Sequence, residues 1–259
     1  MRAEVDPSAI VEPGARLGPG VTVGPFAFIA AGAEIGPGCV IGAYAVVHGA
    51  TTLGPDNHVG EGAVLGGEPQ DVKYAGEPTR LVLGRGNRVG RHAILHRGTP
   101  GGGGLTAIGD GCVIEDGAHV GHDCRLGHRV RLGAGSALGG HSVVGDGADI
   151  GPLVGVHQFT HIGRLARIEG QSAVTRDVLP FARAAGNPAE IVGFNREGLE
   201  AWGVSREAVE ALEQAFAWIF ESGLRVAEAV ERIAASLGRF DEVQELLRFM
   251  EERQRGLMR

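Results

Sequence analysis

The sequence predicts a mainly β fold, a parallel β-helix followed by a C-terminal α-helical domain, and three observations support this prediction. Aliphatic residues recur every six positions through the first two thirds of the chain. Glycine is far more frequent than in an average protein. Apolar residues change to helical spacing beyond residue 190. We therefore expect a β-helical domain over residues 1–190 and a helical domain over 191–259.

The six-residue period runs from Val11 to Leu65 and, after a slip of one residue, from Ile108 to Val174. Six is a multiple of the two-residue period of a strand and does not match the 3.6 residues of a helical turn. The marked side chains can therefore stay on one face of short extended segments. Three such segments, about 18 residues, close one triangular coil, with the aliphatic side chains inside and glycines at the corners.

Composition excludes several classes of protein. The chain has 45 glycines among 259 residues but no three-residue repeat, which argues against collagen. A net charge of −7 gives no basic surface for nucleic acid. Three cysteines without a C-x-x-C pair indicate neither a disulfide framework nor a thiolate zinc site, which favours a reducing cytoplasm. No apolar run reaches the roughly 18 residues of a membrane span, and the start of the chain lacks a secretory apolar segment.

Two interruptions of the repeat predict loops near residues 68–80 and 99–105. Leu65 and Leu83 are 18 residues apart, one full coil, so the first loop can leave the prism and re-enter in phase. The second contains the run Gly101–Gly104, which is not followed by the G-K-[ST] of a phosphate-binding loop. Loops that interrupt a regular scaffold usually carry function.

Three helices are expected in the C-terminal domain. The first has Ser205 as its N-cap and ends near Gly223. The second starts near Val226 and ends near Gly238, and Asp241 with Gln244 resembles a capping box at the start of the third. We expect their apolar faces to pack against each other.

Histidines cluster in the middle coils. Because positions 18 residues apart stack about 4.8 Å apart, Gly140 should lie beside His122 and His141 beside Asp123. An imidazole next to an unobstructed backbone N–H suits acyl transfer, with the imidazole as base and the N–H as oxyanion donor. A zinc site built from histidines of neighbouring coils, or simple surface histidines, remain alternatives at this point.

Several segments resemble one known family over essentially the whole chain. The most specific are the loop D-x-K-Y-x-G-E-P-T and the motif A-H-x-x-H-D. The matching segments are Gln70–Thr79, His96–Thr99, Ala118–Cys124, Gly140–His141, Val156–Phe159, Gly186–Pro188, Ser205–Ala208 and Arg255–Arg259. Together they resemble the UDP-N-acetylglucosamine O-acyltransferases.

The resemblance implies a left-handed β-helix and transfer of a 3-hydroxyacyl group from acyl carrier protein to the 3-hydroxyl of UDP-N-acetylglucosamine, the first step of lipid A biosynthesis. It implies a cytoplasmic homotrimer that needs no metal or other cofactor. By the same resemblance His122 is the general base, Asp123 its companion and Gly140 the oxyanion donor. The substrate-binding residues that it implies are Asp71, Lys73, His119, His141, His157, Gln158, Gly170, Asn195 and Glu197.

Within these roles, Gly170 matches the position that limits acyl-chain length, and Asn195 and Glu197 match a nucleotide-contacting connector. Lys73 is the only lysine in the chain, which independently suggests a specific contact. The family usually has a phosphate-contacting arginine where this chain has Ala201, and Arg196 is the nearest replacement.

Three alternatives stay open. One is N-acylation of a UDP-amino or UDP-diamino sugar, the second is a zinc-dependent hexapeptide-repeat hydratase, and the third is a non-catalytic β-helix scaffold. The sequence does not define the acyl-chain length. For the acidic carrier protein, composition suggests docking near Arg164, Arg167, Arg183 and Arg232.

Overall fold

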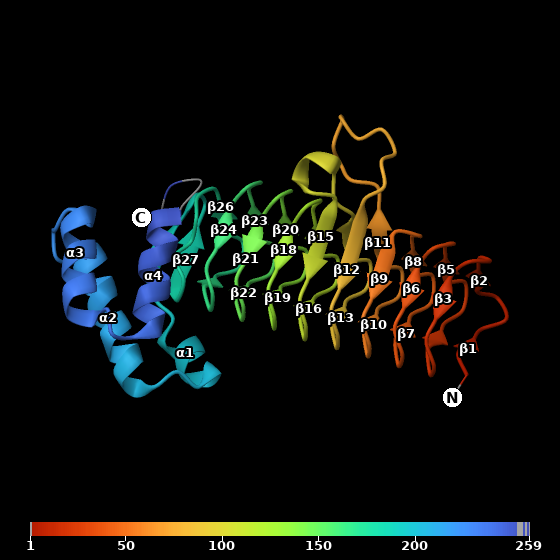
Figure 1. Ribbon diagram of the computed structural model, residues 1–259, viewed down its shortest axis with the longest axis horizontal. Helices are drawn as coiled ribbons and strands as arrows, with labels where there is room; N and C mark the ends of the chain where they lie inside the picture. Colours follow the sequence, from red (N-terminus) through yellow and green to blue (C-terminus); the bar gives the residue numbers. More distant parts are fainter. Residues whose placement is uncertain (1, 253–255, 257, 259) are drawn as a thin grey trace.

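The computed structural model describes residues 2–252, 256 and 258. The chain forms a long three-sided prism of short strands, with a group of helices at its C-terminal end and the N-terminus at the other (Figure 1). This confirms the predicted β-helix followed by helices. Of the terminal motif Arg255–Arg259, only Gly256 and Met258 are among the described residues.

Three sheets form the sides of the prism, and consecutive strands up to β26 go to them in strict rotation. Sheet A consists of β1 (Glu4–Val5), β4 (Thr22–Val23), β7 (Val40–Ile41), β10 (His58–Val59), β13 (Arg88–Val89), β16 (Val113–Ile114), β19 (Arg131–Leu132), β22 (Asp149–Ile150), β25 (Arg167–Ile168), β27 (Ala182–Gly186) and β28 (Ala189–Phe194). Sheet B consists of β2 (Ile10–Val11), β5 (Phe28–Ile29), β8 (Val46–Val47), β11 (Val64–Gly67), β14 (Ile94–His96), β17 (His119–Val120), β20 (Ala137–Leu138), β23 (Gly155–Val156) and β26 (Ala173–Val174). Sheet C consists of β3 (Arg16–Leu17), β6 (Glu34–Ile35), β9 (Thr51–Leu53), β12 (Arg80–Leu83), β15 (Leu105–Ile108), β18 (Arg125–Leu126), β21 (Val143–Val144) and β24 (His161–Ile162).

Neighbouring strands within each sheet are parallel, apart from the antiparallel pair β27 and β28 at the C-terminal end of sheet A. The predicted 18-residue stacking is present: His119 pairs with Ala137, and Ala137 pairs with Gly155. In the two-residue strands the second side chain points inward, as for Leu132 and Ile150, which are fully buried. The core is therefore a column of stacked aliphatic side chains along the prism axis.

Both loops leave the prism at the corner between sheets B and C. Residues 68–79 lie between β11 and β12, and residues 97–104, which include a short 3₁₀ helix at Pro100–Gly102, lie between β14 and β15 (Figure 1). The prediction of one full coil between Leu65 and Leu83 is wrong. Leu65 is in sheet B and Leu83 in the next sheet, C, because the loop is inserted at a corner and replaces no strand.

Four helices follow, α1 (Arg196–Trp202), α2 (Arg206–Phe220), α3 (Val226–Leu237) and α4 (Asp241–Glu252). Ser205 caps α2 as predicted, by accepting a hydrogen bond from the Ala208 N–H. Helix α1 was not predicted, and β28 continues the sheet to Phe194. The predicted capping box is wrong, because Asp241 already lies in the first turn of α4 and the Gln244 amide donates to the Gly238 carbonyl. Helix α2 ends at Phe220, three residues before Gly223.

The inward and outward positions of one strand give a direct test of the core. Leu138 is 1% exposed, whereas the adjacent Ala137 is exposed. We expect Leu138→Ala to lower the free energy of unfolding by about 2–5 kcal/mol, because it leaves a cavity in the column. Ala137→Ser should change it by less than about 0.5 kcal/mol. Denaturant unfolding of both variants checks this, and equal effects would contradict the assignment of the inward face.

Candidate active site

The predicted catalytic residues and both loops meet at the corner between sheets B and C. His122 and Asp123 lie between β17 and β18, Gly140 and His141 one coil further along, and Gln158 in the coil after that. Since all the coils turn this corner in the same way, residues far apart in sequence are stacked along one edge of the prism. The structure therefore brings together most of the site that the sequence predicts.

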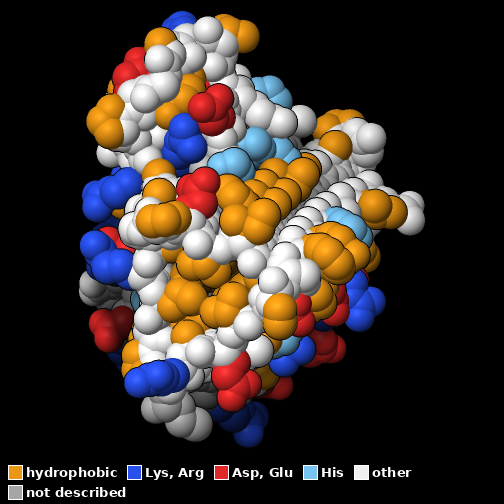
Figure 2. Space-filling model, turned by 90° about the vertical axis from the view of Figure 1, so that its right-hand side faces the viewer, with side chains coloured by type: hydrophobic (Ala, Val, Ile, Leu, Met, Phe, Trp, Pro, Cys, Tyr) orange, Lys and Arg blue, Asp and Glu red, His pale blue; other side chains and the backbone are white. Residues whose placement is uncertain are grey.

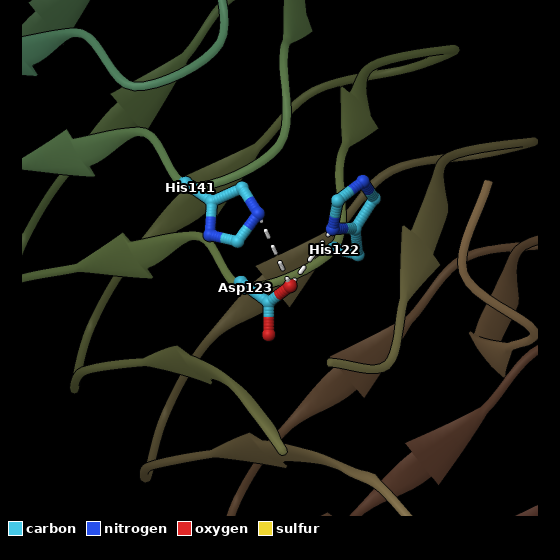
Figure 3. A group of neighbouring side chains, drawn as sticks. All are labelled: His122, Asp123 and His141. Carbon is cyan, nitrogen blue, oxygen red and sulfur yellow. Dashed lines mark hydrogen bonds and ion pairs between the residues drawn. The ribbon is translucent and has the colours of Figure 1, made fainter. Parts of the chain in front are cut away.

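His122 and Asp123 form a hydrogen-bonded pair, the dyad. The His122 Nδ1 lies 2.8 Å from the Asp123 Oδ2, and the Asp123 side chain is only 1% exposed (Figure 3). A carboxylate can only accept hydrogen bonds, so the neutral imidazole carries its proton on Nδ1. This leaves the lone pair of Nε2 available to accept a proton from a substrate.

Thr99 fixes the Asp123 carboxylate from the glycine-rich loop. The Thr99 N–H donates to Oδ1 at 2.8 Å and its hydroxyl donates to Oδ2 at 2.7 Å. Thr106 adds a third contact by accepting from the Asp123 N–H at 2.8 Å. A Cβ at Gly102 would overlap the Asp123 carboxylate, so the loop can pack this closely only because residue 102 is glycine. No contact of these three residues with Asp123 was predicted from the sequence.

Gly140 lies directly beside the His122 ring. A Cβ at residue 140 would be 2.7 Å from His122 Nε2. Among the residues that the structure describes, none accepts a hydrogen bond from the Gly140 N–H. The His122 ring and an unused backbone donor are thus neighbours, as the 18-residue stacking predicted.

His141 packs at the same place. Its Nε2 lies 3.6 Å from the Asp123 Oδ2, its ring meets the His122 ring edge-on at 5.1 Å, and its other face stacks on Phe159 at 4.4 Å (Figure 3). Burial lowers the pKa of His141 from its usual value, with Asp123 opposing and His122 adding to the shift. The neutral ring can therefore act as a hydrogen-bond partner for a substrate.

Two pockets adjoin this corner. One, the polar pocket, has a volume of about 570 Å³ and is lined by residues of both loops and of the corner, including Gln70, Asp71, Lys73, His122, His141, Gln158 and Phe159. The other, of about 460 Å³, lies on the outer face of sheet B and is lined among others by His119, Ala137, Gly155, His157 and Ala173. Gln70 lines both pockets, so the 68–79 loop connects the polar pocket to the groove with small residues.

Three predicted residues are not at this corner. Gly170 lies between β25 and β26, at the corner between sheets A and B. Asn195 is buried as the N-cap of α1, where its amide donates to the Leu165 carbonyl and accepts from the Gly198 N–H. Glu197 is exposed, 3.6 Å from Arg167. Within one chain these residues are therefore separate from His122.

Ala201 lies in a third pocket, between α1 and sheet A, together with Asn195, Glu197 and Arg167. Arg196 is paired with Glu200 of its own helix α1 and with Glu213 of α2, so its charge is already neutralised. Arg167, in contact with Glu169 and Glu197, is the cation that lines the pocket itself.

A metal ion could also be considered at this corner. In the part of the chain that the structure describes, one cluster, His122, Asp123 and His141, has ligand atoms within 4.8 Å of one another. It differs from the histidine-only set expected for zinc. Asp123 Oδ2 already accepts hydrogen bonds from His122 and Thr99, and a metal there would break the bond that orients His122. The donor set fits hydrogen bonding better than coordination.

Four histidines near this corner share one electrostatic property. In each of them the pKa is lowered, and burial is the largest cause. The four are His48, His96, His119 and His141. A histidine with a lowered pKa in the folded state binds fewer protons than in the unfolded chain as the pH falls through about 6.5. The free energy of unfolding is therefore highest above that pH and falls on acidification, as the unfolded chain takes up the proton first.

We accordingly expect the melting temperature to fall between pH 7 and pH 5, before the carboxylates titrate. His119→Asn should make this decrease shallower, because it removes one of the four groups. The matched control, His58→Asn, removes a histidine of sheet A that stays exposed in the folded chain, and it should change the slope less than His119→Asn does. Calorimetry across the pH range checks this, and a melting temperature that rises on acidification would contradict it.

Comparisons with known proteins agree with this geometry. The family profile described as UDP N-acetylglucosamine O-acyltransferase, domain 2, matches residues 177–258, and the bacterial transferase hexapeptide profile matches residues 32–67 and 106–140. The acyl-[acyl-carrier-protein]–UDP-N-acetylglucosamine O-acyltransferase of Myxococcus xanthus is 48% identical, covering 99% of this chain and 100% of the relative. The enzyme of the same name from Paraburkholderia phymatum is 41% identical over 99% of this chain and 100% of the relative.

Solved structures give the same result. The UDP-N-acetylglucosamine acyltransferase from Campylobacter jejuni is 32% identical and superposes with a TM-score of 0.93, covering 98% of this chain and 99% of that one. The fold predicted from the repeat and the resemblance, a left-handed parallel β-helix with a C-terminal helical domain, is confirmed. The chain belongs to the UDP-N-acetylglucosamine O-acyltransferase family.

Proposed function

We propose that this protein transfers a 3-hydroxyacyl group from an acyl carrier protein thioester to the 3-hydroxyl of UDP-N-acetylglucosamine, the first step of lipid A biosynthesis. Its relatives carry the corresponding name. The observation that supports the chemistry most strongly is the His122–Asp123 pair, with Nε2 next to the unused N–H of Gly140. The comparisons lend no support to an N-acyltransferase or to a zinc-dependent hydratase.

The proposed reaction needs only groups of this chain and the two substrates. His122 Nε2 removes the proton of the acceptor hydroxyl while its oxygen attacks the thioester carbonyl. Asp123 stabilises the imidazolium, and the Gly140 N–H donates to the oxyanion of the tetrahedral intermediate. When the intermediate collapses, the C–S bond breaks and the proton passes from His122 to the leaving thiolate. No metal or other cofactor takes part in the proposed reaction.

The pocket residues provide contacts for the sugar and the acyl chain. Asp71 and Lys73, on the loop, face His141 and Gln158 across the polar pocket, and we assign these four to the acceptor substrate. His119 and His157 line the groove over sheet B, which we assign to the acyl chain. The small residues at positions 137, 155 and 173 leave room in this groove for a methylene chain.

The separate positions of Gly170, Asn195 and Glu197 support a homotrimer in which a neighbouring copy completes the site. Sheet B lies between the corner of Gly170 and the corner of His122, so one chain cannot use both at one point. A neighbouring prism packed against sheet B would present its own Gly170 to the groove. It would also present its own pocket between α1 and sheet A, lined by Asn195 and Glu197, to the loop. Gly170 would then limit acyl length from the partner, and Asn195 would act by holding α1, which carries Glu197.

The outer face of sheet B supports such packing. None of its described strands has a charged residue at the outward position, which is taken by Ile10, Phe28, Val46, Val64, Ile94, His119, Ala137, Gly155 and Ala173. The stacked, exposed rings of Phe26 and Tyr44 extend it at the corner with sheet A. Figure 2 views the molecule from its N-terminal end and shows rows of hydrophobic side chains on the exposed surface. A surface of this kind marks an association site.

Carrier-protein docking and cellular location remain proposals. Of the four arginines suggested for docking, Arg164, Arg167 and Arg183 are paired with glutamates. Within the described residues Arg232 has no carboxylate partner and lies over Trp218, at 4.3 Å. It is the best placed of the four to meet an acidic protein.

None of the described helices has the length and hydropathy to cross a membrane, and we propose a cytoplasmic enzyme.

The experiment that tests the function uses the purified protein with 3-hydroxyacyl carrier proteins of different chain lengths. UDP-N-acetylglucosamine should give a product with one O-linked acyl chain, identified by mass spectrometry. The 3-amino analogue of the sugar nucleotide is the competing acceptor. A clear preference for the analogue, or turnover that depends on added zinc, would contradict the proposal.

His122 is the residue on which the chemistry depends most. His122→Ala should lower kcat by about 10²–10⁴-fold, because it removes the general base. The trimer and its melting temperature should stay close to those of the wild type. Steady-state kinetics with gel filtration checks this, and near-normal turnover would exclude His122 from the role.

Two adjacent glycines test the support of the dyad. A methyl group at Gly102 would overlap the Asp123 carboxylate, whereas one at Gly101 would meet nothing within 4 Å, and neither residue has a positive φ. Gly102→Ala should therefore reduce kcat by about 10²-fold through displacement of the dyad. Gly101→Ala, the matched control, should stay within about threefold of the wild type. Equal activities of the two variants would show that the contact of this loop with Asp123 is dispensable.

A further inference from the structure

The 68–79 loop makes few hydrogen bonds with the prism near its tip. Val72, at the tip, is fully exposed, and Asp71 accepts a hydrogen bond from the Lys73 N–H of the same loop. A loop of this kind needs an anchor if its side chains are to stay over a pocket, because its own contacts do not fix its position. The anchor in this structure comes from the next coil.

That anchor is Arg97, whose side chain is only 14% exposed. Its Nε and Nη2 donate to the Tyr74 hydroxyl at 3.1 and 2.8 Å, and its Nη1 donates to the Gly66 carbonyl at 3.1 Å. The guanidinium also lies over the Tyr74 ring, 5.4 Å from its centre. The Tyr74 hydroxyl donates in turn to the Glu77 carbonyl at 2.7 Å. Arg97 thus holds the end of β11, from which the loop starts, and the middle of the loop at the same time.

The neighbours of Arg97 in sequence connect this anchor to the dyad. His96 Nδ1 lies 2.6 Å from the Glu68 carbonyl at the start of the loop, and Thr99 holds the Asp123 carboxylate. Residues 96–99 therefore contact the substrate loop at one end and the catalytic pair at the other. The geometry allows one short segment to set the distance between the loop and His122.

We propose that Arg97 is a positioning residue: by clamping Tyr74 it keeps the 68–79 loop over the polar pocket, so that Asp71 and Lys73 are held in place for the acceptor substrate. This inference rests on the proposed function for the identity of the substrate. It assigns Arg97 and Tyr74 to substrate binding, through the loop, and leaves bond formation to His122.

The sequence offers a precise probe of the loop. Lys73 is the only lysine in the chain, so a lysine-specific protease can cut at one bond only, between residues 73 and 74. The cutting rate of the folded protein reports how often the loop leaves its clamped position. Each rate is divided by that of the same variant unfolded in denaturant, which corrects for any effect of residue 74 on the protease.

We expect Tyr74→Phe to raise the corrected cutting rate by about tenfold, the effect of one lost hydrogen bond to a charged group. Arg97→Met should raise it at least as much, because it also removes the hydrogen bond to the Gly66 carbonyl. The effect of the double variant should be smaller than the product of the two single effects, since both changes remove the Arg97–Tyr74 contact. Arg91→Met is the matched control. Its side chain lies in the same coil, is 65% exposed and pairs with Glu61, so this change should leave the rate unaltered.

Kinetics separate positioning from a general structural role. Arg97→Met and Tyr74→Phe should raise the KM for UDP-N-acetylglucosamine by about tenfold and change kcat by less than about threefold. Arg91→Met should change neither. In the wild type, UDP-N-acetylglucosamine should also protect Lys73 from the protease.

Three results would overturn the proposal. They are cutting rates in the two variants equal to that of Arg91→Met, additive effects in the double variant, and a fall in kcat at unchanged KM. The cutting rates need no substrate, so they test the clamp even if the proposed function fails. If the cutting rates of the variants are as expected but UDP-N-acetylglucosamine does not protect Lys73 in the wild type, the clamp stands and the assignment of the loop to that substrate fails.

Discussion

The closed triangular coil is the constraint on which the rest of the structure depends. Each strand is too short to be stable alone, and it gains its hydrogen bonds only from the strands one coil before and after it. The coil length must therefore stay constant from one turn to the next. Insertions are accepted only at corners, where they do not disturb the stacked aliphatic column. Both loops of this protein follow that rule.

The same constraint builds the active site. Because consecutive coils repeat the same corner, the proposed base, the proposed oxyanion donor and the second histidine are stacked along one edge of the prism. What distinguishes this corner from the other two is the pair of loops inserted in adjacent coils. One loop brings Thr99 to the Asp123 carboxylate, and the other brings Asp71 and Lys73 over the pocket. A uniform scaffold thus becomes a polar, partly enclosed site at a single place.

The extent to which the sequence predicted this arrangement follows from the same reasoning. Spacing of 18 residues was enough to place Gly140 beside His122 and His141 beside Asp123, since no insertion separates these coils. It could not place Thr99 against Asp123 or Arg97 against Tyr74, because those pairs span loops whose paths no period describes. It also misplaced Leu83 by one sheet for that reason. The roles matched by resemblance to Asn195 and Gly170 concern residues that lie apart from His122 within one chain, so they depend on the proposed homotrimer.

The central claim is that Asp123 keeps the His122 proton on Nδ1, so that Nε2 is free to act as the base. Nitrogen-15 NMR of the histidine rings at neutral pH measures this directly, with His122 assigned by comparison with His122→Ala. The account predicts that His122 is in the Nδ1–H form, and that Asp123→Asn alters this tautomer. A His122 ring protonated on Nε2 in the wild type would contradict the account, because no lone pair would then face the acceptor hydroxyl.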